Sequence, residues 1–248
     1  MRLRLDHLII RAEDPAAVMA ELAARAGTPV LAEVEALGGM SSGIVRAGDV
    51  DIEVLRVGRE PLLRPHGYGI GLVADVGLDE AIAVLRLQGF ATSAALPGVA
   101  GQGAKRRTWR AAQVRGLLPD PFPAPATTRP PSRLDATTAT IAGALTRIPA
   151  VSRLASRRAG GSMVVVTEYG FDAGAWRSGA AGGPRVEAVH VRTAGHREAW
   201  ARLGLSDDRL QVRDEGPAGI ARVVLAGDSA AARDDFRVGD VAFTFAAD

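Results

Sequence analysis

The sequence predicts an α+β fold built from three copies of one unit, a strand followed by a helix and three further strands (βαβββ). The spacing of apolar residues alternates between a period of two and a helical period along the 248 residues. Two pairs of segments also match one another: Leu5–Ile10 superposes on Val186–Val191, and Gly48–Val54 aligns with Gly239–Phe245. Such internal similarity indicates a supersecondary unit that is used more than once.

The first module is expected at residues 1–60. It opens with an alternating run that predicts a strand, and the inward face of this strand is expected to carry Leu3, Leu5, His7 and Ile9. Asp14 is a helix N-cap followed by proline at the first helical position, and Gly27 ends the helix predicted at Pro15–Ala26. Three strands should follow, at Val30–Leu37, Gly43–Arg46 and Val50–Val57.

The second module is expected at residues 66–171 and contains an insertion at about 116–161. Its strands and helix are predicted at Tyr68–Val76, Leu78–Gln88, Arg107–Val114 and Met163–Tyr169. The first part of the insertion, up to Pro131, has too many prolines for a helix or a sheet ladder. Its second part, about 135–158, has a helical pattern.

The third module, at residues 184–248, follows a glycine-rich linker and is a degenerate copy of the unit. Its elements are predicted at Arg185–Thr193, Arg197–Leu203, Leu210–Arg213, Ile220–Ala226 and Val238–Phe245.

Composition narrows the class of protein. Hydrophobic residues make up 47% and charged residues 23%, which is typical of a globular chain. The chain has no cysteine, which excludes disulfides, thiolate nucleophiles and cysteine-bound zinc. A net charge of +2 and an aromatic content of 4% argue against a nucleic-acid partner, and no apolar run is long enough to cross a membrane. A cytoplasmic location is therefore expected.

Five short motifs follow the order of the predicted strands. They are Leu5-Asp-His7-Leu-Ile, Asp51-Ile-Glu53-Val-Leu, Gly69-Ile-Gly-Leu-Val, Thr108-Trp109-Arg110 and Val166-Thr-Glu168-Tyr-Gly170. In this order and spacing the chain resembles the vicinal oxygen chelate superfamily, and within it the glyoxalase-like domain group. The resemblance implies that two modules pair into a half-open barrel with a divalent metal ion in its concave face.

The same resemblance implies a set of metal ligands. His7 and Glu53 would bind the metal from the first module and Glu168 from the second, with Glu53 or Glu168 also serving as the catalytic base. The fourth ligand position falls at Gly69, which has no side chain, so water, substrate or His66 would complete the shell. One imidazole and two carboxylates suit Zn, Mn, Fe or Ni. The third module has no equivalent ligand pair.

Further residues are weaker candidates for substrate contact: His66, Trp109, Arg110, Tyr169 and His190. Ordinary alternatives exist for several of the candidates. His7 could be a hydrogen-bonded core histidine, Glu53 could lie on a solvated strand face, and Glu168 could form a strand-end ion pair with an arginine. The two aromatic residues could be core residues, and the basic cluster that includes Arg110 could be a solvated edge.

Three functions are compatible with these observations. The first is a metal-dependent lyase, isomerase or dioxygenase that acts on a small molecule with adjacent oxygens. The second is a metal-free protein that binds or sequesters a small molecule in the same cleft. The third is a protein-interaction module that uses the insertion. An odd number of modules leaves one sheet without an internal partner, which predicts a homodimer.

Overall fold

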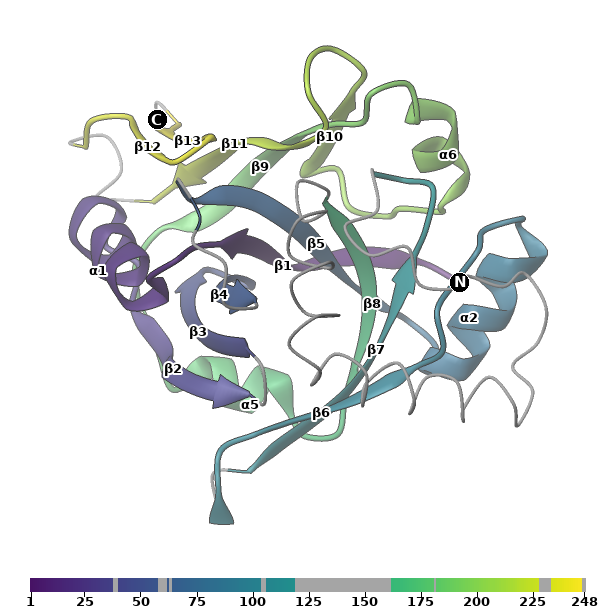
Figure 1. Ribbon diagram of the computed structural model, residues 1–248, viewed down its shortest axis with the longest axis horizontal. Helices are drawn as coiled ribbons and strands as arrows, with labels where there is room; N and C mark the ends of the chain where they lie inside the picture. Colours follow the sequence, from purple (N-terminus) through teal and green to yellow (C-terminus); the bar gives the residue numbers. More distant parts are fainter. Residues whose placement is uncertain are drawn as a thin grey trace.

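The computed structural model describes residues 1–37, 40–57, 62, 64–103, 106–118, 162–180, 182–227 and 233–246. The proline-rich and helical parts predicted within the insertion lie outside the described residues, apart from the first few residues of the proline-rich part. The predicted α+β fold is confirmed, because helices pack against two β-sheets (Figure 1).

The first module has the predicted order of elements: β1 (Leu3–Arg11), α1 (Pro15–Ala26), β2 (Val30–Leu37), β3 (Met40–Ala47) and β4 (Val50–Val57). Helix α1 begins where the Asp14 carboxylate accepts a hydrogen bond from the backbone N–H of Ala17, at 3.0 Å. It ends at Gly27, whose φ of 70° is the left-handed conformation that glycine adopts without strain.

The second module contains one strand that the sequence does not reveal. Its elements are β5 (His66–Ala74), α2 (Leu78–Leu87), β6 (Leu96–Ala100), β7 (Arg107–Val114) and β8 (Met163–Tyr169). The additional strand is β6, which is short, contains Pro97 and pairs with β7 on one side only. A short helix that was also not predicted, α5 (Ala173–Ser178), follows β8.

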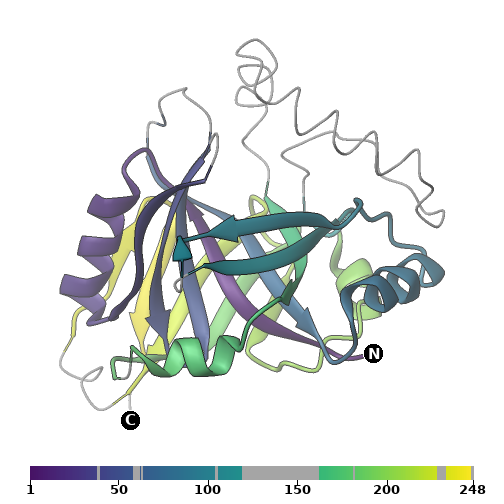
Figure 2. The ribbon, with the colours of Figure 1, turned by 90° about the horizontal axis from the view of Figure 1, so that it is seen from below.

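The first two modules form a single eight-stranded sheet in the order β2-β3-β4-β1-β5-β8-β7-β6. Within each module the first and last strands are parallel neighbours, and the antiparallel pair β1–β5 joins the two modules. The sheet curls until its two ends approach each other, as Figures 1 and 2 show. Its concave side therefore encloses a space that both modules line.

The third part forms a separate five-stranded sheet. Its elements are β9 (Arg185–Arg192), α6 (Arg197–Arg202), β10 (Leu210–Arg213), β11 (Gly219–Ala226), β12 (Phe236–Val238) and β13 (Val241–Phe245). The strand order is β10-β9-β11-β13-β12, so the last strand pairs with β11 and not with β9. This pairing differs from that of the first module, in which β1 and β4 are neighbours. The connection after β9 contains the six-residue helix α6 and leads to β10, which pairs directly with β9.

The main hydrophobic core lies between the two sheets, on the outer side of the curled sheet. Leu8 and Ile70 contribute to it from the large sheet, and Val223 and Phe243 contribute from the small sheet. The contact is close: a Cβ added at Gly67 would lie 2.9 Å from the Cβ of Ile220. The outer face of β1 and β5 is thus covered, and the concave face is left for other contacts.

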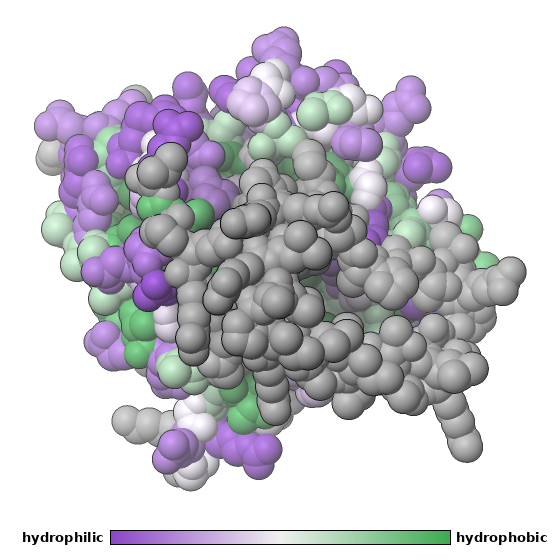
Figure 3. Space-filling view, viewed as in Figure 1, coloured by the Kyte–Doolittle hydropathy of each residue, from purple (hydrophilic) through white to green (hydrophobic). Residues whose placement is uncertain are grey.

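The coloured surface in Figure 3 mixes hydrophilic and hydrophobic residues. Among the described residues, the most exposed of the large apolar side chains is that of Leu87, which is 88% exposed. No helix in the described part of the chain is both long and apolar enough to cross a membrane.

Candidate functional site

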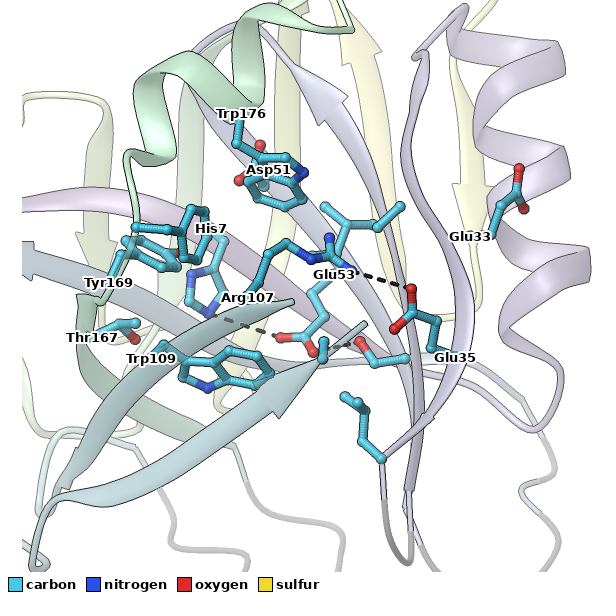
Figure 4. A pocket seen from close by; sticks show the side chains of 16 residues that line it. His7, Glu33, Glu35, Asp51, Glu53, Arg107, Trp109, Thr167, Tyr169 and Trp176 are labelled. Atoms are coloured by element: carbon cyan, nitrogen blue, oxygen red, sulfur yellow. Dashed lines mark hydrogen bonds and ion pairs between the residues drawn. The ribbon is translucent and has the colours of Figure 1, made fainter. Parts of the chain in front are cut away.

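A cavity of about 90 Å³ lies on the concave side of the large sheet. It is lined by His7, Ala32, Glu33, Glu35, Leu37, Ser42, Ile44, Asp51, Glu53, Ala100, Arg107, Trp109, Thr167, Tyr169, Phe171 and Trp176 (Figure 4). The first two modules and the segment after β8 all contribute to the lining.

A β-bulge determines which side chains of β1 reach the cavity. The pairing of β1 with β5 shifts between Leu5 and His7, so Asp6 is an extra residue in the strand. Leu3 and Leu5 consequently face the core between the sheets, whereas His7 and Ile9 face the concave side. The predicted inward face is therefore corrected, because a bulge shifts the alternation by one residue.

A second bulge in the same strand pair reveals the symmetry of the site. The pairing shifts again around Tyr68, and an approximate two-fold axis between the strands relates this bulge to the one at Asp6. The residue after the first bulge is His7, and the residue after the second is Gly69. The register thus supports the expected equivalence of His7 and Gly69.

The same symmetry locates the counterpart of Glu53. In the first module, the residue two places after His7 is Ile9, which lies opposite Glu53. In the second module, the residue two places after Gly69 lies opposite Val165. The second half of the site therefore has a glycine and a valine where the first half has His7 and Glu53. An apolar cluster that includes Tyr68, Val165 and Ile9 occupies it.

His7 is buried, and both ring nitrogens have acidic neighbours. Nδ1 donates a hydrogen bond to the Asp6 carboxylate at 2.8 Å, since an ionised carboxylate can only accept. Nε2 lies 3.9 Å from Oε2 of Glu53. Burial by itself would lower the pKa of His7, but the hydrogen bond to Asp6 and the surrounding carboxylate charges outweigh burial and raise it.

Glu53 reaches the cavity from β4. Its Oε1 accepts a hydrogen bond from the Ser42 hydroxyl on β3, at 2.5 Å, and its side chain is 24% exposed. The other oxygen, Oε2, faces the space beside His7, as Figure 4 shows. The carboxylate is therefore held at one oxygen and accessible at the other.

Arg177 of α5 lies beneath the cavity and joins two buried carboxylates. It donates hydrogen bonds to Asp6 at 2.7 Å and to Asp51 at 2.8 Å. Burial would raise the pKa of Asp6, but its bond with His7 and the charge of Arg177 hold that pKa well below the ordinary range. Burial raises the pKa of Asp51 to about 6, because Arg177 offsets the cost only in part. The Tyr169 hydroxyl also donates to Asp6, at 2.5 Å.

Aromatic residues form one wall of the cavity. Trp109 packs against Gly98 of β6, where a Cβ would lie 2.1 Å from the indole ring. Tyr169, Phe171 and Trp176 stack edge to face in series, with ring centroids 5.2 Å and 5.6 Å apart. Both Trp109 and Tyr169 line the cavity, as the sequence predicts.

An ion pair closes the barrel across this wall. Arg107 of β7 contacts Glu35 of β2 at 3.2 Å, and its guanidinium lies 4.9 Å from the centre of the Trp176 ring. The other oxygen of Glu35 accepts the backbone N–H of Gly101 at 2.8 Å. These contacts bring the two ends of the large sheet together.

Glu168 does not meet His7 and Glu53. Its carboxylate accepts hydrogen bonds from the backbone N–H of Leu78, at the start of α2, and from Arg110, both at 3.2 Å. Successive residues of a strand point to opposite faces, so the neighbours of Glu168 line the cavity and Glu168 lies outside. This position does not support the predicted role of Glu168 as metal ligand and catalytic base, and it matches the alternative, a strand-end ion pair. Arg110 is held there as well, since it also pairs with Asp79 at 2.5 Å.

Two predicted histidines also lie away from the cavity. His66 is at the start of β5, where its ring packs edge-on against Tyr68 with centroids 5.9 Å apart. His190 is in β9 of the small sheet, opposite Gln211 and Arg222. Neither residue lines the cavity, so their predicted contact with a substrate there is corrected.

Asp6, Ser42, Arg177 and Trp176 also belong to the site, and the sequence pattern does not single them out. One signal was present: the apolar positions change parity between Leu5 and Leu8, which marks the bulge at Asp6. The residues on α5 gave no comparable signal, since they follow β8 in a short segment without clear periodicity.

The donor atoms do not fit the metal centre that the resemblance implies. His7 and Glu53 face one space, but Gly69 and Val165 offer no donor and Glu168 lies outside. Among the residues that the structure describes, no three His, Cys, Asp or Glu side chains are grouped so that they could hold a metal ion. Catalytic metal sites ordinarily use three protein ligands.

Comparison with known proteins establishes the fold. No protein-family model and no curated protein matches the sequence. A solved hypothetical protein from Staphylococcus aureus matches with a TM-score of 0.64 at 8% identity, over 98% of this chain and 99% of that one. The Mn(II)-bound glyoxalase from Novosphingobium aromaticivorans matches with a TM-score of 0.51 at 14% identity, over 97% and 81%. The protein therefore has the fold of the vicinal oxygen chelate superfamily.

Proposed function

We propose that the protein binds a compact small molecule in this cavity without a resident metal ion. The observation that carries the proposal is the asymmetry of the two halves of the site. The first half presents Glu53 and His7 beside an aromatic wall, and the second half is filled by apolar side chains. A largely apolar cavity with a few convergent polar groups is typical of small-molecule sites.

The rival proposal is the metal-dependent lyase, isomerase or dioxygenase. The solved glyoxalase is Mn(II)-bound, so a protein with this fold can hold a metal ion. In this chain, the rival needs donors besides His7 and Glu53, and the described residues of the second module supply none at the equivalent positions. The two proposals differ in metal content and in what Glu53 binds.

Metal content distinguishes the two proposals. We expect less than ~0.1 metal ion per chain by plasma mass spectrometry after incubation of untagged protein with Mn²⁺, Fe²⁺, Ni²⁺ or Zn²⁺ and gel filtration, because two protein donors hold a divalent ion weakly. Glu53→Gln should leave this value unchanged. The matched control is Glu168→Gln, a carboxylate outside the cavity. Near-stoichiometric metal that is lost in Glu53→Gln and retained in Glu168→Gln would overturn the proposal in favour of the metal-dependent enzyme.

We further propose that the protein is a cytoplasmic homodimer, although the five-stranded sheet already packs against the eight-stranded sheet of the same chain. In the described structure, β2, β6, β10 and β12 each pair on one side only, and unpaired strand edges favour association. Light scattering at micromolar concentration is expected to give twice the chain mass of 25.8 kDa. The mass of a single chain would contradict the dimer.

The protein-interaction function rests on the insertion, most of which lies outside the described residues.

A further inference from the structure

Glu53 differs in its partners from the other buried or partly buried carboxylates around the cavity, whereas Glu33, which also lines the cavity, is exposed. Arg177 pairs with both Asp6 and Asp51, and Arg107 pairs with Glu35. Within the part of the chain that the structure describes, Glu53 has contacts with the Ser42 hydroxyl and the His7 ring but with no arginine or lysine. A partly buried carboxylate is stabilised by a nearby positive charge. His7 and Arg177 supply at most two positive charges, and three carboxylates contact them. This end of the cavity therefore stays anionic, and a ligand could neutralise it.

The aromatic wall already holds cations of the protein itself. The guanidinium of Arg107 lies 4.9 Å from the Trp176 ring centre, and that of Arg177 lies 5.6 Å from the Tyr169 ring centre. Trp109 lines the same cavity, and these two guanidinium groups lie over other rings. The indole is the aromatic group that attracts cations most strongly. A positively charged ligand would thus meet Glu53 and the face of Trp109 in one space.

We propose that the occupant of the cavity is a small organic cation, an amine in its protonated or quaternary form with a compact apolar body. This inference deepens the proposed function and rests on it. The positive nitrogen lies beside Oε2 of Glu53, and the apolar body packs against Trp109 and Phe171. The cavity is small, at about 90 Å³, which favours a compact ligand.

Electrostatics disfavours an anionic ligand in the same place. Among the described residues, Arg107 is the one arginine in the cavity lining, and its charge is already matched by Glu35. A carboxylate ligand would therefore meet a group of side chains that keeps a net negative charge, and like charges at short distance repel. A neutral ligand would gain the contact with the aromatic wall but would leave Glu53 uncompensated.

Three ligands that share one ring and differ in charge test the inference. Benzylamine, benzyl alcohol and benzoate are titrated by isothermal calorimetry at pH 7 and low ionic strength, with EDTA present to remove metal ions. Benzylamine is expected to bind about tenfold or more tightly than benzyl alcohol, and benzoate least tightly. Glu53→Gln should weaken benzylamine about tenfold, to the level of the alcohol, and should leave the alcohol unchanged. Glu168→Gln should bind all three as the unaltered protein does. Trp109→Leu should weaken benzylamine more than benzyl alcohol.

The outcomes separate this inference from the proposed function. Binding of benzyl alcohol or benzoate as tight as that of benzylamine would overturn the cation inference and would still support a small-molecule cavity. Benzylamine binding that Glu53→Gln does not weaken would also overturn it. If none of the three binds at millimolar concentration, both the inference and the proposed cavity function fail.

Discussion

Replacing Arg177 by methionine is expected to lower the free energy of unfolding by about 3–5 kcal/mol, because it removes one member of a buried charge network. Asp6 and Asp51 are each 2% exposed, and both would lose the cation that they share. For a chain of this size the loss corresponds to a fall in Tm of roughly 6–20 °C. Urea unfolding followed by circular dichroism, with a thermal scan alongside, measures both quantities.

The matched control is Arg185→Met, which removes an arginine from an exposed ion pair. Arg185 lies 3.4 Å from Glu187, and the two side chains are 63% and 51% exposed. Such pairs contribute about 0–1 kcal/mol, so this variant should unfold close to the unaltered protein. Equal losses in the two variants would show that the buried network does not stabilise the site.

Gly71→Ala is expected to displace the His7 ring and to abolish ligand binding in the cavity. A Cβ at residue 71 would lie 2.0 Å from Cε1 of His7 and 2.3 Å from both ring nitrogens. The ring would have to leave its position between Asp6 and Glu53, at a cost of about 1–3 kcal/mol for overpacking. Calorimetric titration with benzylamine measures the loss of binding, and imidazole NMR resonances report the displacement of the ring.

Two variants serve as controls. Gly77→Ala, at the N-cap of α2, places a Cβ 3.5 Å from the Glu168 carboxylate, an ordinary contact, and should cost no more than about 1 kcal/mol. In a His7→Ala background the ring is absent, so Gly71→Ala should cost much less than it does alone. An equal cost with and without the His7 ring would refute the proposed clash.

The sequence predicted four residues that line the cavity: His7, Glu53 and the aromatic residues Trp109 and Tyr169. It did so through short strand motifs. Such a motif is local, because the spacing of residues within one strand does not depend on what the strand packs against. It placed Glu168 in the site wrongly. The motif around that residue is one position out of phase with the face of β8 that lines the cavity, and one residue changes the face of a strand.

Long-range pairing accounts for the other differences. The bulge at Asp6 exists only against β5, and it shifts His7 and Ile9 to the concave side of the sheet. Arg177 reaches its carboxylates across more than 120 positions of sequence, because α5 folds back beneath the first module. Neither contact has a local pattern from which it could be predicted.

The sequence by itself determined the class of fold, most of the strands and helices, and the half-site formed by His7 and Glu53. Those features depend on local periodicity, helix caps and glycine positions, which act over a few residues. The tertiary structure decided the pairing of the last sheet, the position of Glu168 and the apolar filling of the second half-site. Each of these depends on the register between distant strands, which is fixed when the two sheets bury their shared core.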